Sequence, residues 1–123
     1  MDTLVDHIQY LREMDLHILY EPLQTSLSMD ANFAMMQRIL NNIFSNIQKY
    51  CDPWKDIVIQ TTIEENQLKM SFTNSINHHL DKVESNGIGL KSVKKMIEIH
   101  HGTFYQDKTN DLFTIILTFP IYQ

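Results

Sequence analysis

Cysteine, glycine and proline are all scarce in this chain. The 123 residues include one cysteine, three glycines and three prolines. The lone cysteine, Cys51, excludes an internal disulfide framework and agrees with a reducing compartment, so the sequence predicts a cytoplasmic location. Neither internal repeats nor low-complexity segments occur, which argues against a fibrous or disordered chain.

Long apolar runs are also absent. The longest ones, such as residues 113–117, are the size of a strand and far short of the roughly 20 residues that a bilayer requires. The first residues lack a basic region ahead of an apolar core, so they do not resemble a secretory signal. We therefore expect no direct membrane contact by this piece of chain.

Positive charge is in the minority. Lysine and arginine number 10 against 15 aspartates and glutamates, which gives a formal net charge of -5. Because the chain also has no run of basic residues, the sequence argues against general binding to the phosphates of nucleic acid. Any anion that this protein binds must be held by a local site.

The composition is that of a globular domain. Hydrophobic residues make up 43% of the chain and charged residues 20%, which is ordinary for such a protein. A chain of 123 residues fits one domain and can bury a single core.

The spacing of apolar residues predicts the elements. Apolar residues recur three and four apart over residues 3–14, 29–50 and 87–100, which indicates helices. They alternate over residues 57–63, 68–72 and 112–119, which indicates strands. Residues 15–20 and 103–107 also look like strands, and a weaker extended piece is possible at 25–29. Asp30 is the predicted N-cap of the second helix, and Gly102 the predicted C′ residue of the third.

The connections predict how the strands pair. Polar residues at 65–66 and 110–111 are predicted to turn two hairpins, and the thinly apolar residues 74–86 are predicted to form a loop. Neighbouring strands that pair, with too few helices to cover both faces, indicate an α/β (α+β) two-layer sandwich. We expect a mixed, mostly antiparallel sheet of about five strands, covered on one face by about three helices.

A row of polar side chains marks the second helix. Asn42, Asn46 and Lys49 lie three and four residues apart, so they share one side of the helix, and Tyr50 lies at its end. The outer face of an amphipathic helix normally carries mixed charge, whereas this side carries two amides and a cation. Such a combination favours a ligand that presents oxygen atoms together with a metal ion.

A Gly-x-Gly pattern opens the third helix. Gly87 and Gly89 allow the backbone to come close to phosphate oxygens, and the N–H groups and dipole of a helix start favour negative charge there. Alone, this pattern fits an ordinary tight turn before a helix equally well.

Together, the two stretches resemble the N box and the G2 box of the histidine-kinase-type ATPases. This GHKL superfamily also includes gyrase, MutL and the heat-shock chaperone ATPases. Five residues match the N box, which are Asn42, Ser45, Asn46, Lys49 and Tyr50, while polar Gln48 takes an apolar place. Residues 87–102 look like the G2 box with its following helix. The resemblance covers roughly residues 15–121 and implies the histidine-kinase ATPase fold.

The resemblance implies a site for ATP and Mg²⁺. Asn46 would hold Mg²⁺ through its side-chain oxygen, Asn42 would orient the metal's water or the phosphate, and Lys49 would contact phosphate; these three form the implied catalytic set. Tyr50 would lie against the nucleotide, and Lys82, in a short lid, would meet the γ-phosphate. The implied ATP-binding residues are Asn42, Asn46, Lys49, Tyr50, Asn74, Lys82, Gly87, Ile88, Gly89 and Leu90.

Two positions depart from the family pattern. Asn74 stands where the family has an aspartate that accepts the adenine amino proton. Its amide oxygen can still accept, but it lacks the charge that strengthens such a bond, so we expect adenine binding to be weaker by ~1 kcal/mol. Ser85 replaces the first glycine of the longer family pattern. Asn74 with a short lid looks like the subclass that includes peptide-pheromone and vancomycin-response sensors.

The implied function is phosphoryl donation from Mg-ATP to a histidine on a separate dimerisation domain, with a response regulator downstream. The acceptor motif of the family is absent from this chain, because His7 lacks the sequence context of that motif. We therefore expect residues 1–14 to be a helical tail or linker from an upstream dimerisation segment, and residues 15–123 to be the catalytic domain of a membrane-bound sensor.

Other functions stay open. A regulatory module of the same fold that binds nucleotide poorly is motivated by Asn74, and an anti-sigma-type serine kinase shares the fold. Asn42 replaces the catalytic glutamate of hydrolytic members, which disfavours an autonomous ATPase. Cys51 has no evident base beside it, which disfavours a nucleophile. Trp54 is expected to pack at the start of the first hairpin.

Overall fold

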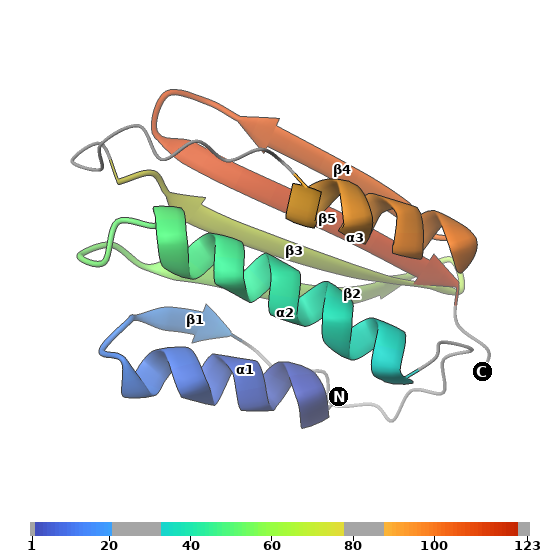
Figure 1. Ribbon diagram of the computed structural model, residues 1–123, viewed down its shortest axis with the longest axis horizontal. Helices are drawn as coiled ribbons and strands as arrows, with labels where there is room; N and C mark the ends of the chain where they lie inside the picture. The colour runs from blue at the N-terminus through green and yellow to red at the C-terminus, as the bar shows by residue number, and fades with distance from the viewer. Residues whose placement is uncertain (1, 21–32, 78–87, 121–123) are drawn as a thin grey trace.

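The structure is a computed structural model that describes residues 2–20, 33–77 and 88–120 (Figure 1). Its elements in chain order are α1 (Asp2–Glu13), β1 (Ile18–Tyr20), α2 (Phe33–Tyr50), β2 (Ile57–Glu64), β3 (Gln67–Ser75), α3 (Ile88–Ile99), β4 (Thr103–Lys108) and β5 (Leu112–Pro120). The predicted extended piece at 25–29, the predicted N-cap Asp30 and most of the predicted loop at 74–86 lie outside the described residues.

The strands form one sheet in the order β1-β2-β3-β5-β4. β1 pairs with β2 in parallel, and the other three pairs are antiparallel. Glu65 and Asn66 join β2 to β3 with φ values of 50° and 63°, as a two-residue hairpin turn with left-handed backbone requires. The prediction of a mixed, mostly antiparallel sheet with a hairpin at 65–66 is confirmed.

The three described helices cover one face of this sheet (Figure 1). α2 lies in the middle of the helical layer, with α1 on one flank and α3 on the other (Figure 1). The two-layer sandwich is therefore confirmed. None of the helices in the described ranges is long and apolar enough to cross a membrane.

The core forms where α2 meets the sheet. The side chains that α2 buries recur three and four residues apart, as the sequence predicts, and are Met36, Ile39, Leu40, Ile43, Phe44 and Ile47. Phe44 meets Phe72 of β3 edge to face, with ring centroids 5.8 Å apart. The apolar side of α2 is thus fixed on the sheet, and its opposite side is left to polar residues.

α1 contributes to the same core. Leu4, Ile8 and Leu11 are at most 2% exposed and belong to the same hydrophobic cluster as the buried residues of α2 and the sheet. Arg12 ties the end of the helix to β1, because its guanidinium donates to the carbonyl of Ile18 at 2.9 Å. The segment predicted to be a tail or linker is therefore packed against the body of the domain.

Two strand boundaries differ from the prediction. The first strand begins at Ile18 and not at Asp15, because Asp15 has a φ of 64° in the turn that follows α1. β3 runs to Ser75 and pairs with β5 along its whole length, so Asn74 lies in a strand and the prediction that a loop begins there is wrong. Backbone pairing requires no apolar side chain, which is why the polar end of this strand was missed.

The end of α3 also differs from the prediction. The left-handed residue is His101, with a φ of 63°, and not Gly102. His101 N–H donates to the carbonyl of Glu98 and Gly102 N–H to that of Ile97, which is the hydrogen-bond pattern of a Schellman motif with His101 at C′. Gly102 is needed for space instead, since a Cβ there would lie 2.2 Å from the carbonyl oxygen of Thr118.

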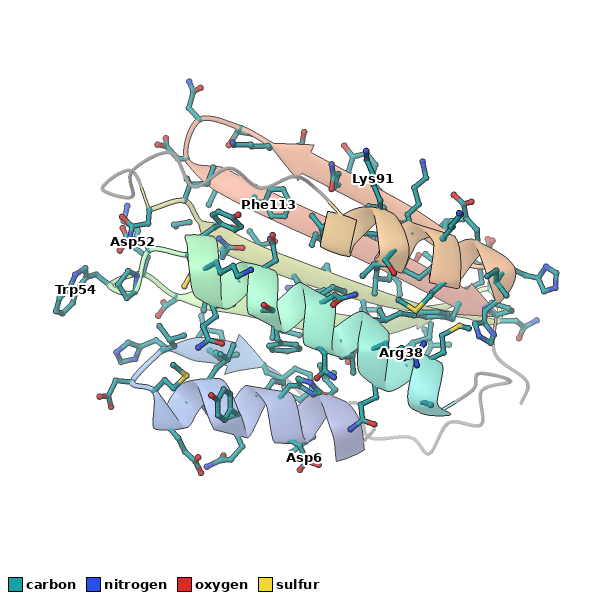
Figure 2. The ribbon with its side chains drawn as sticks, viewed as in Figure 1. Asp6, Arg38, Asp52, Trp54, Lys91 and Phe113 are labelled. Atoms are coloured by element: carbon teal, nitrogen blue, oxygen red, sulfur yellow. The ribbon has the colours of Figure 1, made fainter. Side chains whose placement is uncertain are left out.

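Trp54 lies at a protruding turn. Its side chain is 90% exposed, so the expectation that it packs at the start of the hairpin is wrong (Figure 2). The turn itself is well defined, because Asp52 accepts hydrogen bonds from Trp54 N–H through its carboxylate and from Lys55 N–H through its carbonyl. These bonds order the backbone of the turn, and the indole is left exposed.

Candidate functional site

The polar row of α2 runs along one flank of the helix, beside the apolar side that packs on the core. Asn42, Asn46 and Tyr50 are half-buried, and Lys49 is exposed. Because Ile43, Phe44 and Ile47 hold the apolar side against the sheet, the row is fixed in direction while its polar groups stay accessible. The structure thus places these four residues together, as the sequence predicts.

Asn74 supplies a buried amide at the end of β3. Its side chain alternates with the buried Phe72, so it lies on the sheet face that the helices cover, and it is 3% exposed. The Nδ2 group donates to the carbonyl of Ser75 at 3.1 Å. Because a carbonyl can only accept, the amide nitrogen must face it, and Oδ1 is therefore directed the other way as an acceptor.

Backbone hydrogen bonds join the end of α2 to the end of β3. Asn77 N–H donates to the carbonyl of Tyr50 at 2.9 Å, and Asp52 N–H donates to the carbonyl of Ser75 at 2.8 Å. Cys51 and Ile76 form an isolated antiparallel bridge between them. The end of the polar row and the buried amide of Asn74, far apart in the sequence, are therefore held at one end of the molecule.

The first turn of α3 provides the third part. Ile88, Gly89 and Leu90 lie at the start of the helix as the structure describes it, and α3 packs beside α2 (Figure 1). Leu90 packs partly buried against the core, so its backbone and not its side chain is the part suited to an anion. The remaining predicted residues of this region, Lys82 and Gly87, lie outside the described residues.

The other flank of α2 faces α1 and has a structural role. His7 stacks on Phe44 with ring centroids 5.1 Å apart, and its Nε2–H donates to Asn41 Oδ1. A groove of about 370 Å³ lies along this contact, lined by Tyr10 and Ser45 among others. The groove contains none of the predicted site residues, so Asn41 and Asn42, although adjacent, serve opposite flanks of the helix.

The donor set fits Mg²⁺ held together with a nucleotide. Asn46 offers a neutral amide oxygen that is half-buried on a rigid helix. Mg²⁺ in nucleotide sites typically takes one or two protein oxygens and completes its shell with phosphate oxygens and water. One amide at this position is therefore sufficient, and Asn42 one turn away can hold a water of the same shell.

Cys51 is suited to the core and not to chemistry. It is 5% exposed, and burial raises the pKa of its thiol, an effect that the neighbouring Asp52 carboxylate increases. A thiol whose pKa is raised holds less of the thiolate that acts as a nucleophile. The structure thus agrees with the sequence in disfavouring a nucleophilic cysteine.

We expect Cys51 in the native protein to react with a thiol reagent at neutral pH more than about a hundredfold more slowly than in urea. The measurement is the rate of labelling followed by mass spectrometry, with glutathione under both conditions as the control for the reagent. Equal rates in the folded and unfolded protein would show that the thiol is neither buried nor protected.

Comparison with known proteins identifies the fold. No sequence profile of a known protein family matches the chain. It is 28% identical over 120 residues to the sensor histidine kinase YrkQ of Bacillus subtilis (strain 168). The aligned region covers 96% of this chain and 27% of that kinase. The chain thus spans about a quarter of the length of this curated relative.

Solved structures give the same result. The mycobacterial sensor histidine kinase MprB superposes with a TM-score of 0.79 at 14% identity, covering 98% of this chain and 93% of that one. The nucleotide-free catalytic domain of histidine kinase ThkA superposes with a TM-score of 0.76 at 19% identity, covering 97% and 88%. The chain has the fold of a histidine kinase catalytic domain.

Proposed function

We propose that this chain binds Mg-ATP and donates the γ-phosphoryl group to a histidine on a separate dimerisation domain, as the catalytic domain of a sensor histidine kinase. One observation carries the proposal. This chain has the fold of histidine kinase catalytic domains. On α2, the row of Asn42, Asn46 and Lys49 leads toward Tyr50, and that end of the row lies near the buried amide of Asn74. Groups suited to metal and phosphate are thus followed by an acceptor suited to a nucleobase.

Each end of this site has its own task. Asn74 Oδ1, directed by the carbonyl of Ser75, accepts the adenine amino group, and Tyr50 lies against the nucleotide. Lys49 neutralises phosphate charge, and Asn46 holds Mg²⁺, which draws charge from the phosphates when bound. The backbone of residues 88–90 at the start of α3 would hold phosphate oxygens. Gly87 and Lys82, which lie outside the described residues, are the further candidates for the phosphates, with Lys82 for the γ-phosphate.

Asn42 directs the phosphoryl group to a protein and not to water. A carboxamide cannot take a proton from an attacking water as a carboxylate can. Asn42 is therefore left to orient the metal's water or the phosphate. Chemistry in this site consists of positioning and charge neutralisation, and the nucleophile comes from the partner.

The partners follow from this chemistry. The acceptor is a histidine of a dimerisation domain in the same kinase, and a response regulator receives the phosphoryl group afterwards. The site would work on the cytoplasmic side of a membrane-bound sensor. We propose the subclass with Asn at the adenine position and a short lid, and we keep residues 1–14 as the connection to the dimerisation domain, although α1 packs on the core.

Calorimetric titration with Mg-ATP tests this function. We expect heat of binding in the micromolar to millimolar range and no turnover of ATP by this chain alone. Release of phosphate at a high rate without any partner would identify an autonomous ATPase instead. Absence of heat up to millimolar nucleotide would indicate a regulatory module that keeps only the fold, and transfer to a protein serine would indicate a serine kinase.

A further inference from the structure

Arg38 continues the polar row of α2 by one more turn. It precedes Asn42 by four residues, as Asn42 precedes Asn46, so all three lie on the same side of the helix. Figure 2 shows Arg38 on the N-terminal half of α2, and its side chain is exposed. The four-residue spacing between Arg38 and Asn42 is visible in the sequence, but the residues that match the N box begin at Asn42.

The charge of Arg38 is not neutralised within its own helix. The 18 residues of α2 include two cations, Arg38 and Lys49, and no acid. α3, which packs beside α2, adds Lys91, Lys94 and Lys95 against one acid, Glu98. Half of the ten basic residues thus lie on these two helices of a chain with a net charge of -5, which makes this layer attractive to an anion.

The direction of the row places Arg38 at one particular end of a bound nucleotide. The base end is set by Tyr50 and Asn74, because the hydrogen bonds from Asn77 N–H to the Tyr50 carbonyl and from Asp52 N–H to the Ser75 carbonyl hold the ends of α2 and β3 together. From Tyr50, Asn46 lies about 6 Å away along the helix axis and Asn42 about 12 Å away, and Arg38 follows at about 18 Å. The group that lies farthest from the base, which in ATP is the third phosphate, is therefore the one nearest to Arg38.

We propose that Arg38 contacts the γ-phosphate of the bound nucleotide and thereby distinguishes ATP from ADP. The inference rests on the proposed function of the site. A guanidinium suits this task because its planar fork can donate two parallel hydrogen bonds to phosphate oxygens, whereas Lys49, closer to the base, acts as a point charge. Arg38 thus holds the phosphoryl group in the position from which it is transferred.

The test compares the affinities for Mg-ATP and Mg-ADP. Arg38→Ala is expected to weaken the binding of Mg-ATP by about tenfold and to leave that of Mg-ADP within about twofold. Arg38→Lys, which keeps the charge but loses the fork, is expected to restore part of the difference. Isothermal titration calorimetry of both nucleotides measures these affinities, and a thermal melt of each variant checks the fold.

Lys69→Ala is the matched control. Lys69 alternates with the buried Leu68 and Met70, so it lies on the sheet face away from the helices, and its loss changes the net charge equally. Arg38 has no such role if Arg38→Ala weakens both nucleotides equally, weakens neither, or behaves like Lys69→Ala. If the wild-type chain binds neither nucleotide, the proposed function fails and this inference fails with it.

Discussion

Replacing Asn46 by alanine is expected to reduce the affinity for Mg-ATP by more than about a hundredfold while the protein keeps its melting temperature. In the proposed site, Asn46 supplies the protein oxygen that holds Mg²⁺. The metal would neutralise much of the phosphate charge, because few basic side chains are present to do so. The side chain is half-buried on the polar side of α2 and makes no part of the core, so alanine costs the fold little.

Asn41→Ala is the control for this prediction. It removes the same chemical group from the same helix, but on the flank where Asn41 accepts a hydrogen bond from His7. We expect Asn41→Ala to lower the stability by about 1 kcal/mol and to leave Mg-ATP binding unchanged. Calorimetry and a melting curve on both variants decide the matter, and an Asn46→Ala protein that binds Mg-ATP normally would remove Asn46 from the site.

The fold could be predicted from the sequence to the extent that burial controls it. The apolar spacing of α2 and the alternation in β2 and β5 both reflect one face turned to the core, and the structure buries those same faces. The hairpin turn at Glu65 and Asn66 was visible as well, because two polar residues lay between two alternating runs. These features depend on local pattern alone.

Features that depend on distant backbone could not be predicted. β3 continues through Asn74 because β5 pairs with it there. The polar residues 73–75 show no pattern from which this pairing could be predicted. The turn at Trp54 is ordered by hydrogen bonds to Asp52 and not by burial of its indole. In both cases, a hydrogen bond and not an apolar side chain decides the structure.

The candidate site follows the same division. The row on α2 was readable from spacing, and the structure places it on the polar side of the helix. The hydrogen bonds that join Tyr50 to Asn77 and Asp52 to Ser75 could not be predicted, since they connect segments far apart in sequence. The sequence therefore predicts which residues form the candidate site, and the backbone hydrogen bonds bring the end of the row near the amide of Asn74.

Gly102→Ala is expected to destabilise the protein by about 3 kcal/mol, a shift in melting temperature on the order of 10 °C. A Cβ at this position would lie 2.2 Å from the carbonyl oxygen of Thr118 and 2.9 Å from Cγ2 of Ile97. Thr118 is held in β5 by its pairing with Thr103, and Ile97 is fully buried, so neither can move without disturbing the sheet or the core. Thermal or urea denaturation measures the loss.

His101→Gly separates space from backbone conformation. His101 holds the left-handed position at the end of α3, where glycine has no steric cost, so this variant is expected to stabilise the protein by about 0.5 to 1 kcal/mol. If Gly102 were instead needed for its backbone freedom, as its place after the helix implied, Gly102→Ala would lower the stability through backbone strain. His101→Gly would then also lower the stability, as glycine does in ordinary backbone, so the sign of the His101→Gly effect separates the two explanations. A Gly102→Ala protein that melts within about 2 °C of the wild type would show that the contact with Thr118 relaxes without cost.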